Sequence, residues 1–174
     1  MELSELMAWL AEDDEASRPF RARRLKTLLE EFGEPRHLLL PGGLVSSLTF
    51  EEARRAYLHG LDVATVLLAQ TTLEHMLGGL LRQVGHDGNW GFSEILNRSR
   101  REGLITEAEF DLFDRLRVAR NPYVHAKPPL AEGTLGRRLA TTDDSPYALT
   151  EADATLAITT LLRLVQRHPF SPVA

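Results

Sequence analysis

The sequence predicts an all-α fold, and two observations support this class. No segment alternates apolar and polar residues with the period of two that marks a half-buried strand. At the start of three predicted helices, a threonine stands three residues before an acidic residue, which is the pattern of a capping box. These pairs are Thr49 with Glu52, Thr106 with Glu109, and Thr150 with Asp153. At 174 residues, the chain is long enough for one well-packed core.

Residues 1–48 are predicted to be a helical extension packed on the same core. Residues 3–10 form a short leading helix, and residues 19–32 form an amphipathic helix whose apolar side chains recur at helical spacing. Gly33 ends this second helix, because glycine is the commonest residue just past a helix C-terminus. The stretch from Gly33 to Leu48 is predicted to be irregular.

Residues 49–174 are predicted to form the main helical domain, built on one long central helix over residues 50–84. The middle of this helix is apolar nearly all round, as a buried helix should be, and Gly85 ends it. Shorter helices are predicted over residues 93–102, 107–120 and 151–167, and an irregular stretch over residues 127–149.

Composition limits the function classes. The chain has no cysteine, which excludes disulfides, thiolate metal sites and cysteine nucleophiles. The N-terminus is acidic and no apolar run approaches roughly 18 residues, so we expect a cytoplasmic protein with no membrane partner. The net charge of −5 does not suit a protein that coats nucleic acid, so any such contact must be local. The six histidines show no metal-ligand spacing, and we assign no metal and no cofactor.

Residues 120–125, Arg-Asn-Pro-Tyr-Val-His, hold the most informative motif of the chain. A guanidinium offers planar, paired donors to phosphate oxygens, and an imidazole can take and give a proton near neutral pH. Because Pro122 disfavours the α region at the residue before it, we expect the helix to end or kink near Asn121. A new turn starting there would swing His125 back towards Arg120. This segment is therefore predicted to handle a phosphate.

The position of Arg120 on its helix indicates an ionic partner. It continues an apolar stripe at spacings of three and four residues, so its side chain points where its neighbours are buried. Glu74 lies in a similar stripe of the long central helix, together with Gln70. We expect a buried ion pair between Arg120 and Glu74, because neither group should be buried alone.

This arrangement resembles the HEPN superfamily. Arg120 and Asn121 are followed by three residues and then His125, at the end of a helix predicted to pack on a long central helix. The resemblance covers roughly residues 49–167, and Pro122 departs from the pattern. It implies an all-α domain in which Arg120 and His125 are catalytic and Asn121 is the polar residue beside the arginine. Glu74 is similar to an acidic residue that some members carry on the long helix.

The resemblance implies a metal-independent endoribonuclease. Many such enzymes of this superfamily act as toxins or defence effectors. In such enzymes a 2′-hydroxyl attacks the neighbouring phosphate, and the motifs of two protomers face one groove. The implied partners are therefore RNA, a second copy of the chain in a homodimer, and an antitoxin or related partner protein. Candidate substrate contacts are Lys127, Arg137 and Arg138 along a phosphate path, and Tyr123, which could stack on a base or simply pack.

Two other interpretations stay open. The same residues suit a non-catalytic interaction or RNA-binding module of the same fold, in which Arg120 is tied to Glu74, Asn121 caps a turn and His125 fills it. A helical bundle that binds a small molecule would instead predict a closed apolar pocket away from Arg120.

Overall fold

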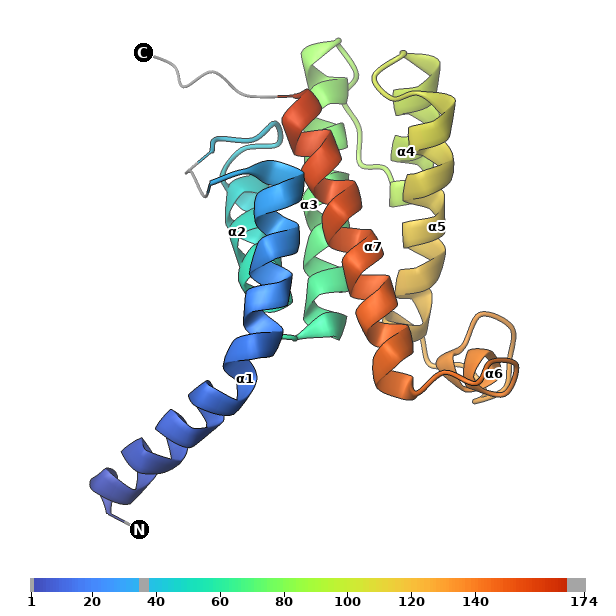
Figure 1. Cartoon of the computed structure of the whole chain (residues 1–174). Helices are drawn as coiled ribbons and strands as arrows, with labels where there is room; N and C mark the ends of the chain where they lie inside the picture. The colour runs from blue at the N-terminus through green and yellow to red at the C-terminus, as the bar shows by residue number, and fades with distance from the viewer. Residues whose placement is uncertain (1, 35–37, 169–174) are drawn as a thin grey trace.

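The computed structural model describes residues 2–34 and 38–168, and every regular element in this part of the chain is a helix (Figure 1). The predicted all-α class is therefore confirmed. None of the described helices is both long and apolar enough to cross a membrane. The helices are α1 (Leu3–Phe32), α2 (Leu44–Leu58), α3 (Asp62–Gln83), α4 (Phe92–Arg101), α5 (Glu107–Val124), α6 (Leu135–Leu139) and α7 (Pro146–Arg167).

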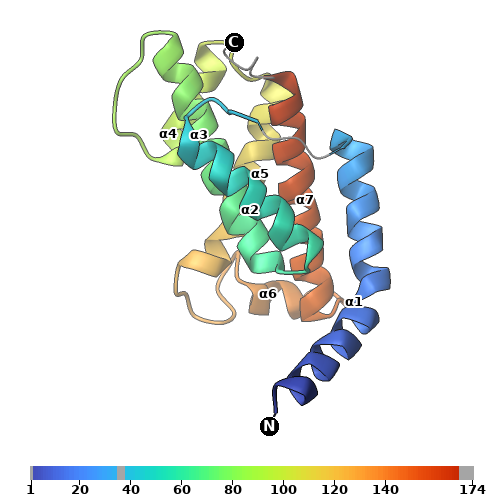
Figure 2. The same ribbon diagram turned by 90° about the vertical axis from the view of Figure 1, so that its left-hand side faces the viewer.

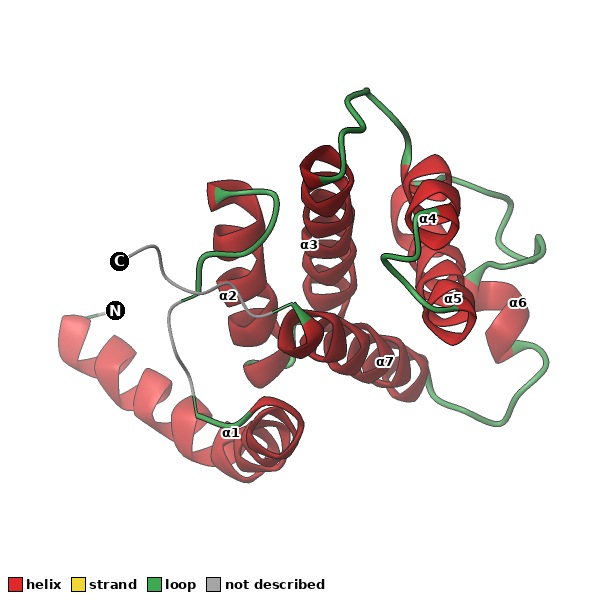
Figure 3. Ribbon diagram, turned by 90° about the horizontal axis from the view of Figure 1, so that it is seen from above, coloured by secondary structure: helices red, strands yellow, loops and turns green. Residues whose placement is uncertain are grey.

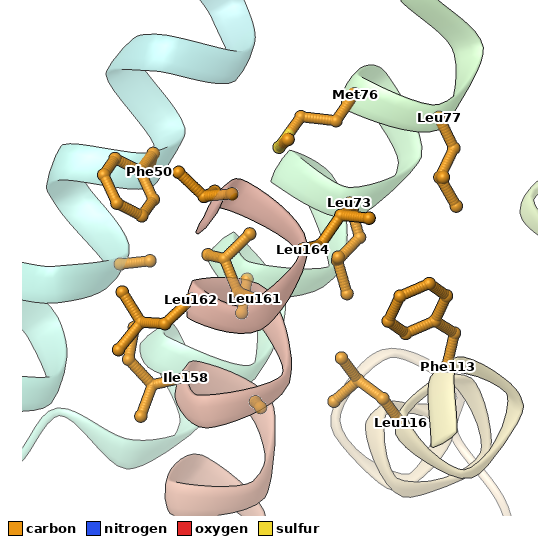
Figure 4. Close-up of a cluster of buried hydrophobic side chains, with 14 of the residues drawn as sticks. Phe50, Leu73, Met76, Leu77, Phe113, Leu116, Ile158, Leu161, Leu162 and Leu164 are labelled. Carbon is orange, nitrogen blue, oxygen red and sulfur yellow. The ribbon is translucent and has the colours of Figure 1, made fainter. Parts of the chain in front are cut away.

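Helix α3 is the centre of the bundle and packs against α2, α4, α5 and α7. Viewed from above, α2 lies on one side of α3, and α4 and α5 lie on the other (Figure 3). Helix α7 runs along a third side of α3, from beside α2 to beside α5. Figure 4 shows the side chains that fill this core, with Leu73, Met76 and Leu77 from α3, Phe113 and Leu116 from α5, and four residues from α7. The α7 residues are Ile158, Leu161, Leu162 and Leu164, all at most 1% exposed.

The long central helix predicted over residues 50–84 is wrong. The chain turns back between Leu58 and Asp62, so α2 and α3 run antiparallel side by side (Figures 1 and 2). Gly60 lies in this turn with a φ of 74°, a conformation that residues with a Cβ rarely adopt. The apolar run on both sides of Gly60 was compatible with one helix, and only the packing of α2 on α3 buries both halves.

The three predicted helix starts had different outcomes. Thr106 begins α5 with a complete capping box, in which its hydroxyl accepts from the Glu109 N–H, so this prediction is confirmed. The Thr49 and Thr150 predictions are wrong, because both residues lie one turn or more inside their helices and donate to backbone carbonyls of the preceding turn. Helix α7 begins instead after Ser145, whose hydroxyl accepts from the Ala148 N–H.

Helix α1 is one helix of 30 residues with Pro19 inside it, where two separate helices were predicted. Its C-terminal part is anchored by Arg24, which is 3% exposed and pairs with Asp62 at 2.7 Å. The N-terminal part extends away from the bundle (Figures 1 and 2). The residue 48/49 boundary predicted for the extension lies inside α2.

Two further differences shape the region of the motif. Helix α5 continues to Val124 instead of ending near Asn121, although Pro122 lies inside it. The His125 N–H donates to the Asn121 carbonyl oxygen at 3.1 Å, so the last turn stays helical after the proline. The stretch 127–149, predicted to be irregular throughout, contains the short helix α6 and the start of α7.

Candidate functional site

A cavity of about 550 Å³ opens between α3, the start of α4 and the C-terminal half of α5. Its volume is within the range of small-molecule and cofactor sites. The cavity contains all four residues that the sequence analysis placed in the catalytic set. Its lining residues are Gln70, Glu74, Gly91, Phe92, Ser93, Glu94, Arg117, Arg120, Asn121 and His125.

The α5 wall of the cavity carries the motif. Helix α5 stays helical through Pro122. As a result, Asn121 and His125, which are four positions apart, project from the same face, with Arg120 beside them. Arg120 and Asn121 are half-buried, and His125 is exposed at the C-terminal end of α5. A cation, an amide and an imidazole thus face one cavity from a single turn and a half of helix.

The α3 wall carries Gln70 and Glu74, which are one helical turn apart. Gln70 is only 3% exposed, and its Oε1 atom has no hydrogen-bond partner in the described part of the chain. Glu74 is half-buried. A buried carboxamide without a partner costs free energy, so its presence on a cavity wall calls for an explanation other than stability.

The ion pair expected between Arg120 and Glu74 does not form, although both side chains line the cavity. Within residues 2–34 and 38–168, neither side chain makes a hydrogen bond or an ion pair. The expectation assumed that both stripes pack directly on each other, whereas the two walls are separated by the cavity. Both charges can therefore reach solvent, and neither needs the other as a partner.

The two other charged residues of the lining are paired. Glu94 accepts from Arg98 at 2.7 Å within α4, and Arg117 donates to Asp114 at 2.7 Å within α5. Both pairs are partly exposed and join residues one turn apart. The cavity therefore combines charges that are neutralised locally with charges that are not.

Five of the lining residues share a lack of pairing, and we call them the cavity cluster. They are Gln70, Glu74, Arg120, Asn121 and His125. None of these five side chains has a hydrogen-bonding or ionic partner among the residues that the structure describes. Free guanidinium and imidazole groups at one cavity can bind an anion and transfer a proton.

Tyr123 and Arg138, two of the predicted substrate contacts, bind within the chain instead. Asp153 on α7 is 6% exposed, accepts two bonds from Arg138 at 2.6 and 2.9 Å, and accepts one from the Tyr123 hydroxyl at 2.7 Å. Burial, and then the hydrogen bond to the Asp153 carboxylate, raise the pKa of Tyr123 above its usual value. We call these three residues the Asp153 cluster. Packing, not base stacking, is the interpretation of Tyr123 that these contacts favour.

Lys127 and Arg137, the other predicted substrate contacts, are exposed and do not line the cavity. Their side chains make no hydrogen bond or ion pair with the described residues. They can therefore meet a ligand that extends out of the cavity, and they stay candidates for phosphate contacts.

Three parts of the lining were not predicted as site residues: Gln70, Arg117 and the start of α4. Gln70 had a visible sign, because a carboxamide interrupts an apolar stripe of α3. Arg117 and the α4 residues had none, since their place on the cavity depends on how α4 packs against α3 and α5. Among the described residues, no group of three or more histidine, aspartate or glutamate side chains is placed to hold a metal ion.

Comparisons with family models, curated proteins and solved structures gave no match to this chain.

Proposed function

We propose that this protein is a metal-independent endoribonuclease of the HEPN type, which cleaves RNA by 2′-hydroxyl transesterification. One observation carries the proposal: Arg120, Asn121 and His125 face a single cavity and have no partner in the described part of the chain. Groups of this kind contribute little to folding, so their convergence is best explained by a ligand. A phosphodiester is the ligand that a guanidinium and an imidazole suit together.

In the proposed reaction, the 2′-oxygen of a ribose attacks the adjacent phosphorus and the bond to the 5′-oxygen breaks. One proton leaves the 2′-hydroxyl, and one proton is delivered to the departing 5′-oxygen, leaving a cyclic phosphate and a 5′-hydroxyl. His125 transfers a proton, which contributes about 10²–10⁴-fold. Arg120 stabilises the negative charge that develops on the phosphate oxygens. Asn121 supplies a neutral donor beside it.

The two proton transfers require two groups, and each chain offers one imidazole at this cavity. We therefore propose a homodimer in which the C-terminal ends of both α5 helices face one groove. A twofold axis there places each His125 opposite its twin. Sedimentation across a dilution series, with cleavage measured on the same samples, tests this assembly. Activity should fall as the dimer dissociates, and a fully active monomer would contradict it.

The proposal includes a biological role as a toxin or defence effector acting on RNA in the cytoplasm. Such an enzyme requires control, for which an antitoxin or related partner protein is the natural device. Co-expression toxicity that depends on His125 would support this role, and growth unaffected by the active protein would oppose it.

The direct test is cleavage of RNA by the purified protein in the presence of a chelator. The wild type should produce 2′,3′-cyclic phosphate and 5′-hydroxyl ends, and His125→Ala should not. His59→Ala is the matched control, because His59 is exposed at the end of α2 and away from the cavity. RNA binding without cleavage by the wild type would identify a non-catalytic RNA-binding module instead. If the wild type neither binds nor cleaves RNA, the proposal is refuted.

A further inference from the structure

We propose that the α3 wall of the cavity recognises a guanine base next to the scissile phosphate, with Glu74 and Gln70 as the residues that contact the base. This inference rests on the proposed ribonuclease function and adds the substrate preference of the same site. It starts from the difference between the two walls. The α5 groups that have no partner in the described part of the chain include a cation, whereas those of α3 are a carboxylate and a carboxamide.

The α5 wall suits the phosphate, so the α3 wall must face another part of the substrate. A free carboxylate repels phosphate oxygens, and Glu74 would weaken RNA binding unless it met hydrogen-bond donors. RNA carries donors on its bases and on its 2′-hydroxyl groups. The cavity of about 550 Å³ has room for a base as well as a phosphate.

Guanine is the base whose Watson–Crick edge offers two donors side by side, N1–H and the N2 amino group. A carboxylate has two acceptor oxygens and can take both bonds at once. Adenine and cytosine place an acceptor nitrogen where guanine has N1–H, and uracil offers a single donor between two acceptors. Glu74 therefore matches guanine and is mismatched with the other three bases.

Gln70 supplies the complementary contact. Its side chain is 3% exposed and lines the cavity, and its Oε1 atom has no partner among the described residues, so it is held in place without an interaction that uses its polarity. The Oε1 atom is an acceptor, and it can take the second N–H of the guanine N2 amino group, which the Glu74 carboxylate leaves free. Residues four apart on a helix lie on the same face, so Gln70 and Glu74 can contact neighbouring atoms of one base edge.

Phe92 forms an apolar part of the same lining, at the start of α4. Apolar surface beside a base edge excludes water and makes the loss of a hydrogen bond more costly. A substrate without guanine would leave the Glu74 carboxylate desolvated and unpaired. We expect this to lower kcat/KM by about tenfold to a hundredfold.

The experiment uses RNA oligonucleotides with one cleavable phosphate. In one series only the nucleotide before this phosphate is varied, and in a second series only the nucleotide after it. The wild type should cut beside guanosine at least about tenfold faster than beside adenosine, cytidine or uridine. Inosine lacks only the N2 amino group, and its substitution for guanosine should remove most of the preference. Equal rates beside all four bases, or equal rates for guanosine and inosine, would overturn guanine recognition while leaving the nuclease intact.

Two variants connect the preference to the α3 wall. Glu74→Gln and Gln70→Leu should each reduce the ratio of guanosine to adenosine cleavage, with circular dichroism and thermal unfolding confirming that both fold. Asp111→Asn, on an exposed part of α5, makes the same carboxylate-to-amide change outside the cavity and should keep the wild-type ratio. A preference that survives both cavity variants would show that other residues read the base.

Binding separates this inference from the ribonuclease proposal. His125→Ala protein should bind an RNA containing guanosine at least about tenfold more tightly than its inosine counterpart, measured by fluorescence anisotropy. If the wild type cuts no RNA but this binding preference is present, the nuclease proposal fails and base recognition stands. If binding shows no preference, base recognition fails whether or not RNA is cut.

Discussion

Two groups of polar side chains lie on different faces of α5, and they differ in how their hydrogen-bonding capacity is used. In the Asp153 cluster, the buried carboxylate is bound by Arg138 and by the Tyr123 hydroxyl, so α5, α6 and α7 are tied together. In the cavity cluster, Arg120 and its neighbours face an open space and bind nothing within the described chain.

The difference separates polar groups that hold the fold from groups that await a ligand. Removing one member of a buried network leaves the others unsatisfied, which costs stability. Removing an unpaired group from a cavity wall costs little, because no partner is left behind. The two clusters should therefore respond in opposite ways to substitution, with stability lost in one and activity lost in the other.

The largest expected effect is on activity and comes from Arg120→Ala. This variant should lower kcat for RNA cleavage by about 10²–10³-fold, because it removes a charge aimed at the transition state. Its free energy of unfolding should change by less than about 1 kcal/mol. Arg115→Ala is a matched control, since Arg115 is exposed on α5 outside the cavity lining. A large loss of stability in Arg120→Ala would place Arg120 with the structural residues and break the comparison.

The next effect is on stability and comes from Asp153→Ala. We expect a loss of about 3 kcal/mol in urea unfolding, at the lower end for a broken buried pair because the Arg138 side chain is 31% exposed. Asp111→Ala, an exposed aspartate of α5, should change stability by less than about 0.5 kcal/mol. Equal stabilities for the two variants would show that the Asp153 cluster does not hold the helices together.

Tyr123→Phe should cost about 1–2 kcal/mol near neutral pH, because it removes one hydrogen bond to a buried carboxylate and keeps the ring. Since burial and the Asp153 hydrogen bond raise the pKa of Tyr123, the folded protein keeps the phenol proton longer than the unfolded chain does. This contribution is complete below the unfolded value of about 10 and is lost as the pH rises through the higher folded value.

Urea unfolding of the wild type and Tyr123→Phe at pH 8 and pH 11 measures this dependence. The difference between the two proteins should shrink at the higher pH. Tyr147→Phe, which changes an 84% exposed ring, should show no difference at either pH. A gap for Tyr123→Phe that stays constant would mean that the phenol does not bond to Asp153.

The smallest expected effect is the stability change of Glu74→Ala. Because Glu74 has no partner in the described chain, its removal should shift the free energy of unfolding by less than about 0.5 kcal/mol, or raise it slightly. Thermal unfolding beside Asp153→Ala is the measurement. A loss comparable to that of Asp153→Ala would restore the structural ion pair with Arg120 that the sequence analysis expected.

The location of the candidate site residues at one place in the fold was partly predictable from the sequence. The neighbouring positions of Arg120, Asn121 and His125 follow from the chain itself, and the apolar stripes indicated that Glu74 would point towards them. The same stripes suggested contact where the structure has a cavity. Helical spacing gives the direction of a side chain, but the distance to the facing helix depends on how α4 packs against α3 and α5.

The sequence by itself determined the features that depend on residues close together in the chain. The all-α class follows from local hydrophobic spacing, and the start of α5 follows from hydrogen bonds between Thr106 and Glu109, three residues apart. Tertiary structure decided the rest. The turn at Gly60 is stabilised by the packing of α2 on α3, and the continuation of α5 past Pro122 coincides with the anchoring of Tyr123 by Asp153. Asp153 has partners, and Glu74 has none among residues 2–34 and 38–168. Pairing between helices depends on which side chains meet in space, and the local sequence carries no measure of that distance.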